Sequence, residues 1–187
     1  MLSVWQSYLR CLNARPLLTQ AATSGFLFFA GDVIAQQAID RRGVKRHDFY
    51  RTGVMTFTGL CIAGPVLRFW YLSLERLVPG KGSFTVVLKK IALDQLLFAP
   101  VFLAGFFTTI DLLERKGLEE IKKHLKAEYR NALITNYMLW PAVQIITFNF
   151  MPLKHRVGFV QLVALGWNTY LAWAAHKNQQ TSNDSGQ

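Results

Sequence analysis

The stretch 91-IALDQLLFAPVFLAGFFTTIDLL-113 decides the fold of this chain. Asp94 and Asp111 are its only charged residues. A helix needs about 20 predominantly apolar residues to cross the hydrocarbon core of a bilayer. A charge at the bilayer centre costs roughly 3 kcal/mol on insertion scales, so such a residue normally faces a partner or water. The stretch therefore predicts a membrane-spanning helix whose acids are sheltered from lipid.

Four other apolar segments are of similar length, and they cover residues 17–39, 52–74, 131–153 and 157–175. The last two contain no charge and are long enough to span on their own. Segment 17–39 contains Asp32, and segment 52–74 contains Arg68. Together with 91–113, these segments predict an all-α integral membrane helical bundle of four to five apolar helices.

The bundle is expected to form one membrane domain over residues 1–177, with two further helices outside its apolar core. Residues 3–14 place Trp5, Leu9 and Leu12 at helical spacing beside Arg10, which predicts a basic interfacial helix. Residues 114–130 alternate acids and bases, which predicts a charged surface helix. The small polar residues 178–187 predict a disordered tail.

The positive charge of the chain lies between the apolar segments. The net charge is +10, although only 17% of the residues are charged. Basic loops attract anionic lipid headgroups with about 1 kcal/mol per residue near the surface. Lys154 and Arg156 are expected at headgroup level, in a short turn between two spans. We expect membrane lipids as partners and no nucleic acid, because no nucleic-acid motif accompanies the charge.

Polar residues inside the apolar segments are the candidate functional residues. Several recur at helical spacing, as Gln36 does four residues after Asp32, and Arg68 is the natural counter-ion for one of the acids. The pore or polar-network candidates are Asp32, Gln36, Arg68, Asp94, Gln95, Asn136, Trp140 and Gln144. They predict either a hydrophilic lumen or a dry network that fixes helix packing, with interhelical contacts of about 0.6–2 kcal/mol each.

The metal-ligating and nucleophilic residues of the chain show no pattern that indicates an enzyme. No His, Cys and carboxylate cluster has the spacing of a metal site, and no serine–histidine pair lies within the apolar segments. We therefore expect no enzyme activity, no metal and no cofactor. Trp70, Tyr71 and Trp173 lie near segment ends and are expected to be anchors at the membrane interface.

An ordered set of short motifs resembles the Mpv-seventeen and peroxisomal-membrane-protein family of small organelle membrane proteins. The likeness covers about residues 14–175. Its motifs are Arg15-Pro16, Gly31-Asp32, Gln36-Gln37, Gly64-Pro65, Trp70-Tyr71, Asp94-Gln95, Pro100, Thr135-Asn136-Tyr137, Trp140-Pro141-Ala142-Val143-Gln144, Pro152, Arg156 and Trp167-Asn168. Arg68 departs from the pattern, because many members carry histidine there.

The resemblance implies a four-span protein of the mitochondrial inner membrane, with the peroxisomal membrane as the alternative. It is nearest to the mitochondrial, stress-linked branch that includes the Sym-one protein. It also implies channel-like transport of small solutes or metabolites that supports metabolic and mitochondrial DNA homeostasis under stress. The alternative is a non-conducting scaffold that organises inner-membrane complexes or lipid. Assembly into a homo-oligomer remains open.

Overall fold

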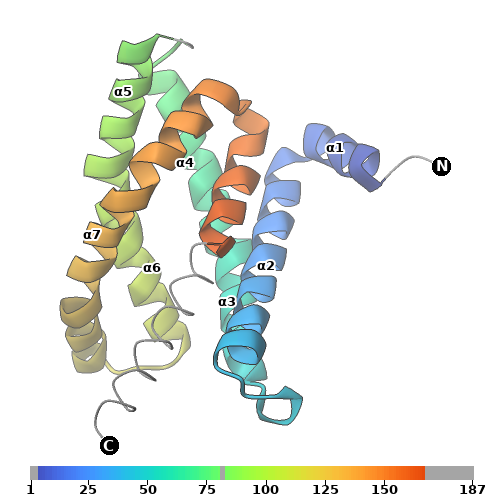
Figure 1. The fold of residues 1–187 in the computed structure, drawn as a ribbon, viewed down its shortest axis with the longest axis vertical. Coiled ribbons are helices and arrows are strands. Elements are labelled where there is room, and N and C mark those ends of the chain that lie inside the picture. The colour runs from blue at the N-terminus through green and yellow to red at the C-terminus, as the bar shows by residue number, and fades with distance from the viewer. Residues whose placement is uncertain (1–3, 81–82, 167–187) are drawn as a thin grey trace, which may run out of the picture.

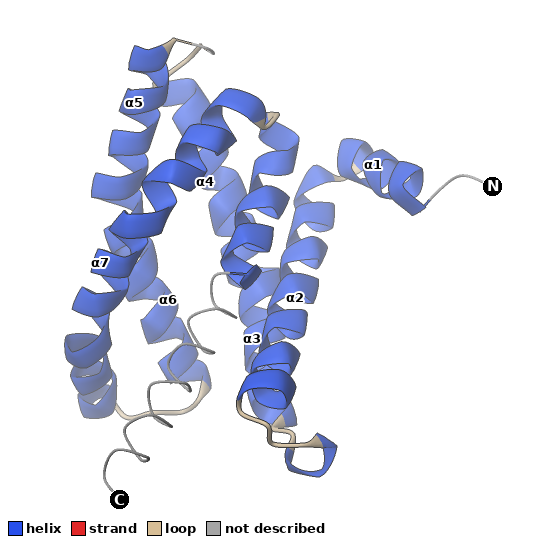
Figure 2. Ribbon diagram, in the orientation of Figure 1, coloured by secondary structure: helices blue, strands red, loops and turns tan. Residues whose placement is uncertain are grey.

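The structure, a computed structural model, describes residues 4–80 and 83–166. It confirms the all-α prediction, since the described ranges contain helices and no strand (Figure 2). The helical elements are α1 (Val4–Ala14), α2 (Pro16–Ile34), η1 (Ala35–Ile39), η2 (Val44–Arg46), α3 (Phe49–Phe57), η3 (Thr58–Ala63), α4 (Gly64–Leu77), α5 (Phe84–Leu93), η4 (Asp94–Phe98), α6 (Ala99–Leu113) and α7 (Leu118–Phe150). A further helical segment begins at residue 153 and is described to residue 166.

These elements join end to end into long antiparallel rods (Figure 1). The first rod is α2 with η1, the second runs from α3 to α4, and the third runs from α5 to α6. The helix α7 and the segment 153–166 then complete the bundle. Helix α1 projects from one end of the bundle, where α2 begins (Figure 1).

Three of the described rods are long and apolar enough to cross a membrane: Pro16–Ile39, Phe49–Leu77 and Phe84–Leu113. The fourth predicted span is not among them, although it carries no charge. Its apolar part in α7 is interrupted by Asn136, Gln144 and Asn149, which lower its hydropathy. Part of the fifth predicted segment, together with Trp173 and the tail 178–187, lies outside the described residues.

The charged segment 114–130 is not the separate surface helix that we expected. Residues 118–130 and the apolar part that follows form the single helix α7, which includes Pro141. No residue between Arg130 and Tyr137 is a glycine or proline that would end the helix. A helix of 33 residues is about 50 Å long, so it accommodates both a charged part and an apolar part.

Two of the rods widen into π-helical turns just before a proline. Segment η3 precedes Pro65 by two residues, and η4 precedes Pro100 by two. Proline lacks an N–H, and its ring clashes with the carbonyl four residues earlier, so the turn before it opens. In η4, the wide turn buries the two successive residues Asp94 and Gln95.

Close helix contact positions the first rod against the second. A Cβ atom added to Gly59 would lie 2.7 Å from the Ser24 carbonyl oxygen, and one added to Gly64 would lie 2.9 Å from the Ala21 Cα. The neighbouring core is formed by Leu67, Tyr71, Leu74, Val87, Phe148, Val157 and Val160. Small residues at these crossings allow the backbones to approach closely.

Candidate functional site

The centre of the site is the carboxylate of Asp94, which is buried between α4, η4 and α7. Three neutral N–H groups converge on it. Trp70 Nε1 donates to Oδ1 at 2.7 Å, while Gln95 Nε2 and Gln144 Nε2 donate to Oδ2 at 2.8 Å and 2.9 Å. No lysine, arginine or histidine in residues 4–80 and 83–166 forms an ion pair with Asp94.

The network continues to the polar stripe of α7. Asn136 Nδ2 donates to Gln95 Oε1 at 2.9 Å, and Gln144 Nε2 also donates to the Tyr71 hydroxyl at 3.3 Å. The structure therefore brings together four of the predicted candidates, Asp94, Gln95, Asn136 and Gln144. With Trp140, they line a cavity of about 130 Å³, which we call the inner cavity.

A residue that the sequence interpretation missed completes this cavity. Gln161 is 4% exposed, and neither its Nε2 nor its Oε1 makes a hydrogen bond within the described part of the chain. Gln144 Oε1 is also buried and lacks such a partner. The only signal in the sequence was that Gln161 is the single glutamine of the apolar segment 157–175.

Gln161 also lines a second cavity of about 500 Å³, which we call the outer cavity. Phe28, Gln161 and Ala164 are common to both linings, so the two cavities are adjacent. The outer cavity has a charged wall on each side. Asp32 and Arg51 come from α2 and α3, while Asp111, Glu114, Lys116 and His124 come from α6, α7 and the turn between them.

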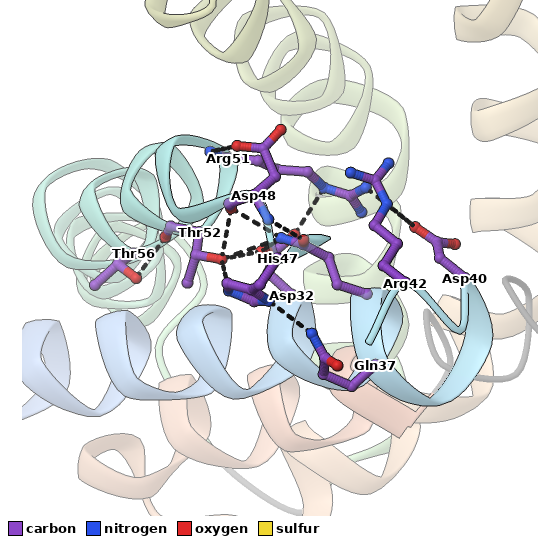
Figure 3. Close-up of polar contacts among 10 residues, drawn as sticks. Asp32, Gln37, Asp40, Arg42, His47, Asp48, Arg51, Thr52 and Thr56 are labelled. Carbon is purple, nitrogen blue, oxygen red and sulfur yellow. Dashed lines mark hydrogen bonds and ion pairs between the residues drawn. The ribbon is translucent and has the colours of Figure 1, made fainter. Parts of the chain in front are cut away.

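Asp32 anchors the first charged wall (Figure 3). Arg51 Nε lies 2.7 Å from Asp32 Oδ1, and the Thr52 hydroxyl donates to Oδ2 at 2.6 Å. Gln36 Nε2 donates to the same Oδ2 at 2.7 Å, and Gln36 Oε1 accepts from the backbone N–H of Asp48 at 2.7 Å. The predicted pair of Asp32 and Gln36 thus joins the end of α2 to the start of α3.

Asp111 anchors the opposite wall. Its Oδ1 lies 2.7 Å from Lys116 Nζ, and its Oδ2 lies 2.7 Å from His124 Nδ1. Lys116 also lies 2.8 Å from Glu114 Oε2, and the hydrogen bonds to Asp111 and Glu114 raise the pKa of the Lys116 ammonium. The side chains of Asp32 and Asp111 are 0% exposed, whereas those of Arg51, Lys116 and His124 are 32–36% exposed. The bases therefore stand between the acids and the open space.

We predicted that Arg68 is the counter-ion of one of the acids, and the structure shows that this prediction was wrong. Arg68 Nη1 donates to Gln20 Oε1 at 3.1 Å, and Arg68 lines neither cavity. Arg51 pairs with Asp32 instead, because α3 begins with the capping bond from Arg51 N to Asp48 Oδ1, opposite the end of α2. The sequence did contain a signal for the start of α3: Asp48, three residues before Arg51, is a residue type that favours the helix N-cap.

Two expected anchors at the membrane interface instead contact the interior of the bundle, and Trp70 is partly buried whereas Tyr71 is fully buried. Trp70 donates to Asp94 and stacks on Phe98, with ring centroids 4.6 Å apart. Tyr71 is 1% exposed and belongs to the core. Tyr71 lines the inner cavity, and its hydroxyl accepts a hydrogen bond from Gln144 Nε2.

Arg156 is a third correction, since it is buried rather than placed among headgroups. Its Nη1 bonds to Glu75 Oε1, and its guanidinium lies over the Phe148 ring at 5.3 Å. Lys90 Nζ donates to the same Glu75 oxygen at 2.9 Å. This triad ties the start of segment 153–166 to α4 and α5.

Within the described ranges, no group of three or more His, Cys, Asp or Glu residues is arranged to hold a metal ion.

Comparison with known proteins gives the family. A sequence profile of the Mpv17 / PMP22 family matches residues 111–172. The chain is 47% identical over 178 residues to the mitochondrial inner membrane protein Mpv17 of Xenopus laevis, covering 95% of this chain and 100% of that one. It is 42% identical to human Mpv17 over 176 residues, covering 94% and 99% of the two chains. It is 46% identical to protein sym-1 of Neurospora crassa over 164 residues, covering 87% and 93%.

No solved structure matches the chain. The relatives nevertheless cover nearly its whole length, at identities far above the level at which family membership is in question. The apolar rods described above agree with a membrane location. The chain belongs to the Mpv17 / PMP22 family and is a protein of the mitochondrial inner membrane.

Proposed function

We propose that this protein is a channel or transport protein for small solutes, with the inner and outer cavities as parts of one water-filled path. The observation that carries the proposal is a set of buried amide atoms that lack a hydrogen-bond partner among the described residues: Oε1 of Gln144, beside the inner cavity, and both amide atoms of Gln161, beside the two cavities. A buried polar group without a hydrogen-bond partner costs about 1–3 kcal/mol. Water or a polar solute removes that cost, whereas a dry bundle would retain it.

The sizes and linings of the cavities support this proposal. The inner cavity has a volume of about 130 Å³, which exceeds the space that one water needs, and the amides of Gln144 and Gln161 offer hydrogen-bond partners to waters in it. Polar groups at intervals then replace the hydration of a passing solute. From the outer cavity inward these are Asp32 and Arg51, then Gln161, then Asp94 with Gln144.

The path would bind and orient small solutes without catalysing a reaction, so the proposal includes no enzymatic step. The two charged walls of the outer cavity carry both signs of charge, which suits a range of small polar solutes. We propose the support of mitochondrial metabolism under stress as the physiological role, through movement of such solutes across the inner membrane.

A blocking substitution tests the proposal in vesicles. Gln161→Phe places a bulky ring where the two cavities meet, whereas Leu162→Phe enlarges the adjacent residue, which is 59% exposed. The purified full chain and both variants would be reconstituted at equal density, and the release of small polar solutes measured. We expect release above protein-free vesicles for the wild type and Leu162→Phe, with a strong decrease for Gln161→Phe.

Two results would reject the path. The first is release no faster than from protein-free vesicles, which would favour a non-conducting scaffold. The second is equal release by both variants. If Gln161→Phe does not fold, Gln144→Phe is the substitute, because Gln144 lines the inner cavity from α7.

A further inference from the structure

The charge of Asp94 differs from every other buried charge in the described part of the chain. The buried charged residues there are Asp32, Lys90, Asp94, Asp111 and Arg156. Asp32 pairs with Arg51, Asp111 pairs with Lys116, and both Lys90 and Arg156 pair with Glu75. Asp94 alone has only neutral partners. An uncompensated buried charge is strongly unfavourable, so this carboxylate calls for a cation from outside the chain.

The hydrogen bonds at Asp94 suit its ionised form. All three of its side-chain partners, Trp70, Gln95 and Gln144, present N–H donors to the carboxylate. A neutral carboxyl would need an acceptor for its own O–H, and these contacts supply none. The three donors therefore favour the ionised carboxylate at the edge of the inner cavity, whereas burial alone opposes it, so a cation in the cavity would complete its compensation.

Amide oxygen atoms that accept no hydrogen bond from the described residues lie around the same cavity. They are the buried Oε1 atoms of Gln144 and Gln161. Carboxylate and amide oxygens are the ligands of hard cations. The aromatic residues Phe28, Phe98, Phe102 and Trp140 also line the cavity.

We propose that the inner cavity binds a small monovalent cation, with Asp94 as its charged ligand and the side-chain oxygens of Gln144 and Gln161 as neutral ligands. One carboxylate balances one positive charge, whereas a divalent ion usually takes several carboxylates and six or more oxygens. An alkali metal ion and a primary ammonium group share the required chemistry. The inference rests on the proposed path for the route by which the ion enters.

Thermal unfolding of the purified full chain in detergent tests the site. Potassium, sodium, methylammonium or magnesium chloride would replace choline chloride at constant ionic strength, so that general screening is unchanged. We expect a monovalent cation to raise the unfolding temperature. Beyond half-saturation, the rise should be about 3–5 °C for each tenfold increase in concentration. A response to potassium or sodium alone identifies a metal-ion site, and a response to methylammonium identifies an ammonium site.

Two variants separate the site from general salt effects. Asp94→Asn should abolish the cation-dependent rise, and Gln161→Leu should shift it to higher concentration while leaving the carboxylate in place. Glu119→Gln is the control, because Glu119 is highly exposed on α7 and should leave the rise unchanged. If Asp94→Asn does not fold, the wild type and Gln161→Leu decide the question, with radioactive rubidium binding to the wild type as the direct measure.

The proposal is overturned if monovalent cations act no differently from choline or magnesium, or if Asp94→Asn retains the full rise. Failure of this site and failure of the path are distinguishable. Cation binding is measured in detergent and needs no passage, whereas solute release is measured in vesicles and continues if the inner cavity binds water alone.

Discussion

Arg51 Nε lies 2.7 Å from Asp32 Oδ1, across the contact between the first and second rods. The carboxylate is fully covered, and the guanidinium is partly open to the outer cavity. The pair thus has two effects. It allows an acid to lie inside an apolar helix, and it places a positive group on the wall of the proposed path.

Loss of Arg51 should therefore be costly. Arg51→Gln leaves Asp32 buried without a cation, and breaking a buried pair costs about 3 kcal/mol at the lower end of measured values. Arg42→Gln, at a more exposed pair with Asp40, should cost less than about 1 kcal/mol. Unfolding of both variants in detergent measures the difference. The double variant Asp32→Asn with Arg51→Gln should recover part of the loss, and equal destabilisation by Arg42→Gln would contradict this account.

The triad on Glu75 predicts an asymmetry between its members. Glu75→Gln leaves the buried cations Lys90 and Arg156 without their shared carboxylate, so it should destabilise by about 3–5 kcal/mol. Lys90→Met keeps the bond between Glu75 and Arg156 and should cost much less. Chemical denaturation of the two variants tests the order, and a larger effect of Lys90→Met would show that the carboxylate is not the hub.

Close packing of the rods predicts opposite outcomes for two glycine substitutions. Gly59→Ala forces a methyl group to within 2.7 Å of the Ser24 carbonyl oxygen and should cost about 1–3 kcal/mol. Gly53→Ala meets nothing within 4 Å and should be neutral or stabilising by up to about 1 kcal/mol. Both residues lie in the same rod, so unfolding temperatures compare them directly. Equal effects would mean that this helix contact is looser than the structure shows.

Substitution of Arg68 is expected to have no effect on transport. Because it lines neither cavity, Arg68→Gln should leave solute release and ion preference unchanged. Asp94→Asn should alter the ion preference, because it removes the negative charge of the inner cavity. Reversal potentials in planar bilayers compare the two variants. A shift for Arg68→Gln as large as that for Asp94→Asn would assign Arg68 to the path.

The sequence was sufficient for the helical class, for the polar stripe of Asn136, Trp140 and Gln144 along α7 and for the pairing of Asp32 with Gln36, but not for the contact between that stripe and Asp94. These features depend on local spacing, since residues three or four apart share a helix face. The sequence was insufficient for the partners of Asp32, Trp70 and Arg156. These partners depend on which rods are neighbours and on how the rods are aligned along the bundle axis. The wide turn of η4 also changes the helix face on which the following residues lie.

The merging of the charged segment with α7 has a similar cause. A change from charged to apolar composition marks a change of environment, but a helix ends only where the backbone is interrupted. No glycine or proline lies between Arg130 and Tyr137, where the composition changes. Gln161 escaped prediction because one amide on an apolar helix gains meaning only from the cavities on either side of it.

Access of water to Gln161 tests the central claim most directly. Cys11 and Cys61 are exposed and would first be replaced. Gln161→Cys and Val157→Cys would then be treated in vesicles with a small water-soluble thiol reagent. Both residues are buried on the same helical segment, one turn apart, but only Gln161 lines the cavities. A water-filled path predicts rapid reaction at position 161 and protection at 157, whereas equal protection at both positions would contradict it.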